Sequence, residues 1–155
     1  MIQEVAEQHP GKRIELWFQD EARFGQQGTL TRLWARRGSR PPAVRQTQYE
    51  YLYVLGAACP RTGQSVGLLA PELNTKMVNR FFEQFAAEID PDVHVVMIWD
   101  QAGFHRSGEL EVPENVTLIE LPPYSPQLNP MENLWHYLRA HHWSNRRYAD
   151  YDQLR

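Results

Sequence analysis

The chain has 155 residues, 42% hydrophobic and 23% charged, which is the composition of an ordinary soluble globular domain. Its single cysteine, Cys59, excludes an internal disulfide and fits a reducing cytoplasm. No signal peptide is recognisable, and no apolar run approaches the roughly 18 residues that span a bilayer, so no membrane association is predicted. The net charge of −3 does not by itself indicate a nucleic-acid-binding protein.

The first half of the chain is predicted to form a meander of strands. Residues 13–24 alternate between apolar and polar, which is typical of a strand. Four residues share the face predicted to point inward: Ile14, Leu16, Phe18 and Asp20. Residues 29–35 and 48–58 are predicted as further strands. A fourth strand is predicted at 63–69, joined to its predecessor by a turn at 60–63.

The second half is predicted to alternate between helices and strands. A helix begins at Asn74 or Thr75 and runs to about Glu88, with apolar residues at helical spacing. The run 93–99 is apolar without alternation, as expected for a central strand covered on both faces. A short strand at 116–121 and a helix at 130–142 complete an α/β order.

Three acidic residues follow or begin these predicted elements. Asp20 and Asp100 end apolar strands, and Glu132 lies in the first turn of the last helix. Two carboxylates about 4 Å apart repel each other by roughly 4 kcal/mol at an effective dielectric near 20, so a gathering of carboxylates needs a positive partner. Hard oxygen ligands favour Mg²⁺ or Mn²⁺. Glu21 points to the opposite face by alternation, so we expect it to have a supporting part.

Each acid also has a purely structural interpretation. Asp20 and Asp100 suit strand-to-loop boundaries at the surface. Glu132 suits the third position of a capping box behind Asn129, with Pro130 as the first helical residue. Capping and metal binding are compatible, because a helix N-terminus favours an ionised carboxylate.

Basic and aromatic residues provide candidate DNA contacts. Arginines cluster in one segment and recur near the end of the chain, where they suit phosphates or simply a solvated surface. The Tyr124 ring suits stacking on a base, although structural packing explains it equally well. The candidate DNA-binding residues are Arg32, Arg36, Arg37, Arg40, Tyr124 and Arg139.

Three ordered segments resemble a known family. They are WFQDEARF at 17–24, IWDQAGFH at 98–105, and LPPYSP at 121–126 followed by NPMENLW at 129–135. They resemble the catalytic domain of DDE transposases, in particular bacterial insertion-sequence transposases related to mariner elements. The resemblance extends from about residue 13 to about 143. It implies a ribonuclease-H-like fold, in which a central mixed β-sheet is flanked by helices.

The resemblance also implies a site and a reaction. Asp20, Asp100 and Glu132 would be the catalytic residues and would hold two Mg²⁺ or Mn²⁺ ions, with Asp20 bridging both. Glu21, His105 and Asn133 would support them; His105 suits a contact with the scissile phosphate, or equally a buried or solvated histidine. The reaction would be cut-and-paste transposition, with the terminal inverted repeats of an insertion sequence and the target DNA as partners.

The resemblance further implies how the chain is organised. Residues 1–155 would form a single catalytic domain in the bacterial cytoplasm, associated with the nucleoid, and a second copy of the chain in a homodimer is a candidate partner. An N-terminal helix-turn-helix region is expected to be missing, and the last helix to be truncated.

Three other functions fit part of the pattern. A ribonuclease-H-like nuclease that hydrolyses without joining would use the same site. An inactive transposase remnant would act as a DNA-binding or assembly module. A two-carboxylate glycoside hydrolase fits poorly, because it leaves the arginine clusters unexplained.

Overall fold

The computed structural model of the chain describes residues 1–25, 32, 34–40, 51–100, 108–123 and 125–143. Its centre is a five-stranded mixed sheet in the order β3-β2-β1-β4-β5. The strands are β1 (Arg13–Gly25), β2 (Tyr51–Ala58), β3 (Ser65–Ala70), β4 (Val93–Trp99) and β5 (Val116–Glu120). The first three form an antiparallel meander, and β4 and β5 then add in parallel beside β1.

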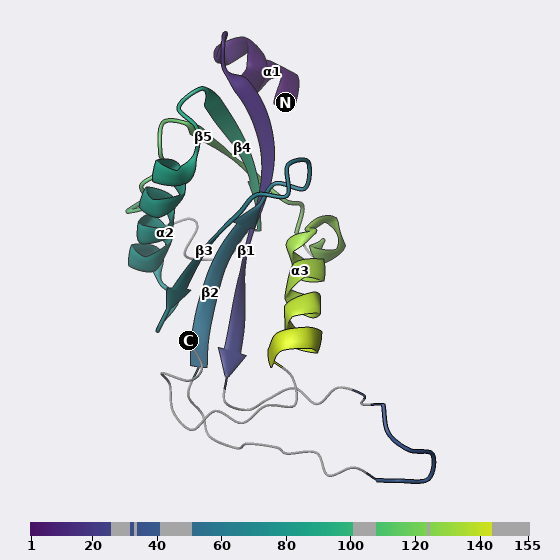
Figure 1. Cartoon of the computed structure of the whole chain (residues 1–155). Coiled ribbons are helices and arrows are strands. Elements are labelled where there is room, and N and C mark those ends of the chain that lie inside the picture. The colour runs from purple at the N-terminus through teal and green to yellow at the C-terminus, as the bar shows by residue number, and fades with distance from the viewer. Residues whose placement is uncertain (26–31, 33, 41–50, 101–107, 124, 144–155) are drawn as a thin grey trace.

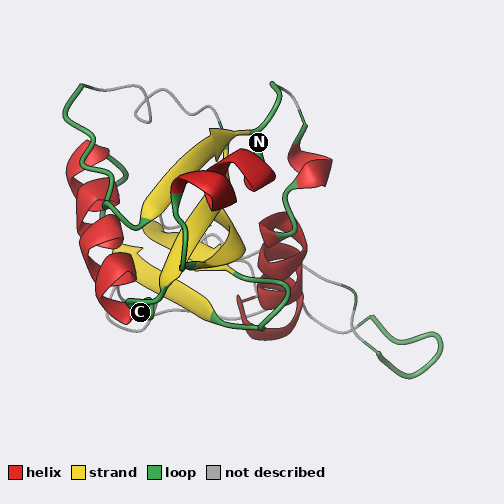
Figure 2. Ribbon diagram, turned by 90° about the horizontal axis from the view of Figure 1, so that it is seen from above, coloured by secondary structure: helices red, strands yellow, loops and turns green. Residues whose placement is uncertain are grey.

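Helices cover both faces of this sheet (Figures 1 and 2). Helix α2 (Thr75–Glu88) packs on one face and α3 (Met131–Leu138) on the other. The larger core lies under α2 and includes Trp17 and Phe85, whose rings meet edge to face with centroids 5.0 Å apart. A smaller core under α3 contains Phe24, Met131 and Trp135. The predicted α/β class, with a mixed sheet flanked by helices, is therefore confirmed.

Several predicted elements are confirmed closely. The first strand, the helix at 75–88 and the strand at 93–99 lie where the patterns placed them. Asn74 caps α2, since its side chain accepts a hydrogen bond from the backbone N–H of Met77 at 3.0 Å. Strand β4 is buried along almost its whole length, although β1 and not β4 occupies the middle of the sheet.

The predicted inward face of β1 is wrong for the first half of the strand. Glu15, Trp17 and Gln19 are buried there, with exposed fractions of 4%, 1% and 2%. The alternate residues from 14 to 20 are only half-buried. The reason is that α2 covers the Trp17 face, whereas the core under α3 takes in the strand's later residues, such as Ala22 and Phe24.

Other boundaries also differ from the predictions. The described residues of the expected strand at 29–35, among them Trp34, belong to no strand, and the rest of that range lies outside the described residues. Residues 48–50 also lie outside them. The last strand ends at Glu120. Helix α3 ends at Leu138 and continues as a π-helical turn, η3 (Arg139–Trp143), so its helical course nearly matches the prediction.

Two short elements were not predicted from the sequence. Helix α1 (Ile2–Gln8) precedes β1, and the 3₁₀ turn η2 (Pro126–Leu128) leads into α3. In the part of the chain that the structure describes, no helix has both the length and the apolar character needed to cross a membrane.

Candidate metal centre

Three carboxylates meet where β1 and β4 separate. The last residue pair between these parallel strands is Phe18 with Ile98, and Asp20 and Asp100 each follow it by two positions. Asp20, Glu21 and Asp100 each offer one oxygen, and these atoms all lie within 4.8 Å of one another. Because the strands run in parallel, their carboxyl ends bring together residues 80 positions apart, which is where ligands gather in α/β sheets.

Asp20 is held by two hydrogen bonds. Its Oδ1 accepts from the backbone N–H of Glu21 at 2.9 Å, and its Oδ2 accepts from the indole N–H of Trp135 at 2.9 Å. The pKa of Asp20 is nevertheless raised to about 7, mainly by burial and also by the negative charges of Glu21 and Glu132, which together outweigh these two donors. Ionised Asp20 is thus under-compensated by the protein's own groups, as expected of a carboxylate that receives a cation.

Glu21 belongs to this group of close oxygens, although strand alternation predicts that its side chain points away from Asp20. Its Oε1 accepts a hydrogen bond from the side-chain amide of Gln19 at 2.8 Å. Gln19 is only 2% exposed, so this donor is fixed by the core under the sheet. Among the described residues Glu21, and not Glu132, completes the group of mutually close ligand atoms.

The start of α3 is tied directly to β1. The Asn129 side chain donates from Nδ2 to the backbone carbonyl of Gln19 at 2.9 Å, and its Oδ1 accepts from the backbone N–H of Met131 at 3.1 Å. Pro130, not Asn129, is the N-cap residue, so the predicted capping box is wrong in detail. The predicted use of the Asn129 side chain at the helix start is nonetheless observed.

Glu132 lies exposed in the first turn of α3. It stands outside the group of mutually close oxygens, but its charge is one of the causes that raise the pKa of Asp20. The structure therefore places all three predicted acids in one neighbourhood, with Asp20 and Asp100 in closer association than Glu132.

Trp135 and Gly56 belong to the site but were not predicted to do so. In the sequence, Trp135 belongs to an apolar stripe at helical spacing, which is typical of a core position. Gly56 lies opposite Asp20 on β2, and a Cβ atom added there would lie 2.7 Å from Cη2 of Trp135. A glycine inside a strand often indicates that another group approaches the backbone closely, and here the Trp135 ring packs directly against Gly56.

The remaining predicted residues are dispersed. His105 and Tyr124 lie outside the described residues. Asn133 is exposed beside Glu132 in the first turn of α3. The guanidinium of Arg139 lies over the ring of Phe24, 5.2 Å from its centroid.

The other candidate arginines lie away from the sheet. Residues 34–40 project from the body of the domain between β1 and β2 (Figure 1). The arginines described here are all exposed, and Trp34 is fully exposed among them. The exposed arginines are Arg32, Arg36, Arg37 and Arg40.

The donor set fits a hard divalent cation. Every candidate ligand atom is a carboxylate oxygen, which Mg²⁺ and Mn²⁺ prefer. A carboxylate whose pKa is raised by burial and by like charge gains most from a cation, because the cation removes both penalties at once.

Comparison with solved structures identifies the class of fold. The chain superposes on the Mos1 strand transfer complex with a TM-score of 0.59 and 13% identity, covering 90% of this chain and 44% of that one. A pre-cleavage Mos1 transpososome gives a TM-score of 0.62 at 14% identity, with 90% and 46% covered. The Mos1 mariner paired end complex with Mn gives 0.57 at 13% identity. The domain has the ribonuclease-H-like fold of that transposase, and it spans less than half the length of those chains.

The family follows from the sequence itself. The family model for DDE superfamily endonucleases matches residues 15–155, so this chain belongs to that family. An uncharacterized protein of Sinorhizobium fredii (strain NBRC 101917 / NGR234), y4pE/y4sA, is 42% identical over 104 residues. That match covers 67% of this chain and 77% of the relative.

Proposed function

We propose that this domain cleaves DNA strands at the ends of an insertion sequence and joins them to target DNA in a reaction that depends on divalent metal ions. The observation that carries the proposal is the convergence of Asp20, Glu21 and Asp100 at the carboxyl ends of two parallel strands. The family and the fold support it. The Mos1 structures named above are of a strand transfer complex and a pre-cleavage transpososome, which makes DNA the substrate class to test.

We propose a separate role for each acidic residue, according to the strand or helix that carries it. Asp20 and Asp100 would hold the cations from the sheet, Glu132 would complete the site from α3, and Glu21 would support Asp20 from the same strand. Two bound Mg²⁺ or Mn²⁺ ions would supply an activated water or 3′-hydroxyl and would stabilise the leaving oxygen. The chain's own part is to hold these carboxylates in place, and a bound cation would favour the ionised form of Asp20.

The proposed DNA contacts lie on the projecting segment. Its exposed arginines suit the phosphate backbone, and the fully exposed Trp34 offers a ring on which an unpaired base would stack. Arg139, which follows the C-terminal end of α3, is proposed as a further phosphate contact. The terminal inverted repeats, the target DNA and a second copy of the chain remain proposed partners.

The first test replaces one predicted ligand. Asp100→Asn keeps the size of the side chain but removes its charge. Metal-dependent cleavage of a labelled, pre-nicked duplex is expected to fall by at least about 100-fold, since a lost ligand forfeits several kcal/mol of transition-state stabilisation and about 1.4 kcal/mol is tenfold. Gel analysis of products with Mn²⁺ measures both cleavage and joining.

The control is Asp92→Asn, in the exposed turn before β4, which should leave cleavage unchanged. Cleavage that survives Asp100→Asn would contradict the proposed site. Cleavage without any joined product from the parent chain would favour the hydrolytic nuclease. If the parent chain neither cleaves DNA nor binds Mn²⁺, the inactive-remnant hypothesis is favoured.

Metal binding is expected to weaken in mild acid. Because the pKa of Asp20 is about 7, its ionised fraction falls roughly tenfold between pH 8 and pH 6, and only the ionised form is a ligand. Isothermal titration calorimetry with Mn²⁺ should therefore show at least a tenfold weaker affinity at pH 6. The apparent binding enthalpy near pH 7 should also vary linearly with the ionisation enthalpy of the buffer, because protons are released on binding. An affinity that does not change over this range would contradict a ligand role for Asp20 with a pKa near 7.

A further inference from the structure

The indole of Trp135 joins two parts of the candidate metal centre that are far apart in the sequence. Its Nε1 donates to Oδ2 of Asp20 at 2.9 Å, although the two residues are 115 positions apart. Trp135 itself is 3% exposed and lies against Phe24, with ring centroids 6.3 Å apart. A buried ring of this size has little freedom, so the position of the donor is set by the packing under α3.

The same helix carries Glu132. Glu132 and Trp135 are three residues apart in α3, which places them on neighbouring positions of one helical face. A bond from Trp135 to Asp20 therefore fixes the helix that carries Glu132 against the strand that carries Asp20. Asn129 adds a second tie between the same elements through the carbonyl of Gln19.

Gly56 makes this arrangement possible. The residue pairs with Asp20 in the β1–β2 ladder, and the space above its Cα is filled by the Trp135 ring and by Cε of Met131. The nearest of these atoms would be 2.7 Å from an added Cβ, a distance that forces the ring to move. The indole thus reaches Asp20 only because β2 has no side chain at this position.

We propose that Trp135 and Gly56 form a positioning pair that orients the Asp20 carboxylate for the cation and sets its distance from Glu132. The proposal rests on the proposed function, because it concerns the same metal centre. The indole N–H occupies one lone pair of Oδ2, and the backbone N–H of Glu21 occupies one lone pair of Oδ1. One lone pair on each oxygen is left for a cation, and rotation of the carboxylate is prevented.

The test is Trp135→Phe, which keeps an aromatic ring in the pocket and removes the N–H. Partners that orient a metal ligand typically contribute 10- to 100-fold to metal affinity, so Mn²⁺ binding by calorimetry is expected to weaken by about that factor. In the parent chain, paramagnetic Mn²⁺ should also broaden the nuclear magnetic resonance signal of the Trp135 indole proton.

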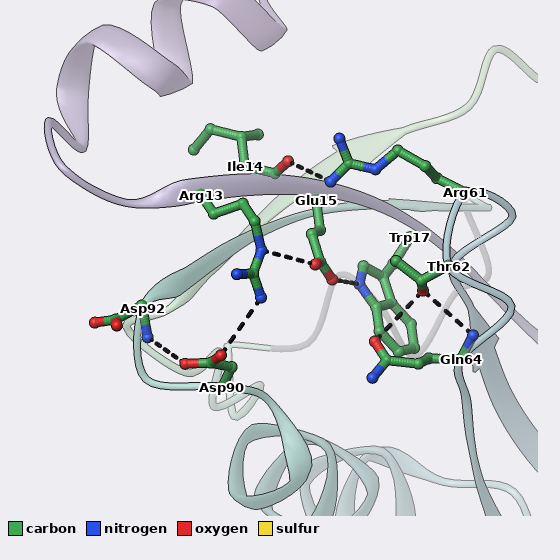
Figure 3. Close-up of polar contacts among 9 residues, drawn as sticks. All are labelled: Arg13, Ile14, Glu15, Trp17, Arg61, Thr62, Gln64, Asp90 and Asp92. Carbon is green, nitrogen blue, oxygen red and sulfur yellow. Dashed lines mark hydrogen bonds and ion pairs between the residues drawn. The ribbon is translucent and has the colours of Figure 1, made fainter.

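The chain offers a matched control on the opposite face of the sheet. Trp17 is 1% exposed, and its Nε1 donates to Oε2 of Glu15 at 3.1 Å (Figure 3). Trp17→Phe therefore also removes one buried indole–carboxylate bond, but Glu15 is no member of the acidic cluster. A comparable fall in melting temperature is expected in both variants, and a fall in Mn²⁺ affinity only in Trp135→Phe.

A second pair of variants tests the same proposal without changing the tryptophan. Gly56→Ala should push the ring away from Asp20 and weaken Mn²⁺ binding about as much as Trp135→Phe. Gly67→Ala is its control, because Gly67 pairs with Gly56 across β2 and β3, and an added Cβ there meets nothing closer than 3.8 Å.

The outcomes separate the two hypotheses. If the parent binds Mn²⁺ and all four variants bind it equally well, Trp135 and Gly56 are structural only and the positioning proposal is wrong, while the proposed function stands. If the parent binds no Mn²⁺, the proposed function fails and the positioning proposal fails with it. Weaker binding in Trp135→Phe and Gly56→Ala, with unchanged binding in both controls, supports the proposal.

Discussion

Asparagine in place of Asp20 is expected to stabilise the metal-free protein at pH 8 while abolishing its binding of Mn²⁺. The folded protein holds the pKa of Asp20 at about 7, against 3.8 for an ordinary aspartate, so keeping it ionised at pH 8 costs folding free energy. Asparagine has nearly the same shape and no charge, but its amide nitrogen cannot accept, so one of the two hydrogen bonds to Asp20 is lost and offsets part of the gain. We expect a gain of about 1–3 kcal/mol in the free energy of unfolding, less than the full shift implies because Asp20 is only half-buried.

The sign of this effect depends on pH. A raised folded pKa means that the protonated form is favoured by folding, so Asp20 contributes stability below pH 4, and this contribution is lost as the pH rises through 7. The difference between Asp20→Asn and the parent should therefore be large at pH 8 and nearly absent at pH 4. Urea denaturation with a chelator present, repeated at both values, measures it.

A change of the surface residue Asp90 to asparagine is expected to have the opposite effect on stability at pH 8. Asp90 is exposed, and its pKa is lowered by the backbone N–H of Asp92 and by Arg13 (Figure 3). Its contribution is present above the ordinary aspartate pKa, so Asp90→Asn should slightly destabilise the protein at pH 8. If Asp20→Asn destabilised the metal-free protein at that pH as well, the carboxylate would be compensated in a way that its two hydrogen bonds do not explain.

Removal of the Phe85 ring is expected to have the largest effect on the stability of the fold. Phe85 is fully buried between α2 and the sheet, with its ring edge-on to Trp17 and 5.9 Å from the ring of Phe81. Truncation of a buried phenylalanine to alanine typically costs about 3–5 kcal/mol, because the cavity is only partly refilled. For a domain of this size, the melting temperature should fall by roughly 10 °C or more.

Leu69→Ala is the matching control. Leu69 lies on β3 and is 44% exposed, so its truncation should cost less than about 1 kcal/mol. Thermal unfolding followed by circular dichroism compares the two variants directly. Equal effects would mean that the core under α2 is not the main source of stability.

The fold was largely predictable because its strongest periodicities coincide with complete elements. The alternation at 13–24 and the helical spacing at 75–88 both gave nearly correct bounds. The inward face of β1 was not predictable from alternation, because both faces of this strand are covered and the deeper core receives Glu15 and Gln19. A carboxylate and an amide suggest solvent in a sequence, yet here both are buried: Glu15 accepts a hydrogen bond from Trp17, and the Gln19 amide nitrogen donates one to Glu21.

The site was predictable in part. Asp20 and Asp100 follow apolar strands, and the parallel pairing of β1 with β4 brings them together as such strand ends do. The proximity of Glu21 was not foreseen, since strict alternation points it away from Asp20, whereas the Gln19 amide holds it beside the cluster. The role of Trp135 could not be predicted, because a tryptophan in an apolar stripe is typical of a core position. The sequence does not show that its indole N–H reaches Asp20, 115 positions away.

The hydrogen bonds that attach α3 to β1 join residues 110 and 115 positions apart. Because of this separation, Asp20 and Asp100 are synthesised before Asn129 and Trp135. On the proposed function, a nascent or truncated chain would have a sheet with two acids but neither the helix nor the indole that orients them. Such a chain is therefore expected to bind Mn²⁺ more weakly than the complete domain, because two long-range hydrogen bonds that fix the site are missing.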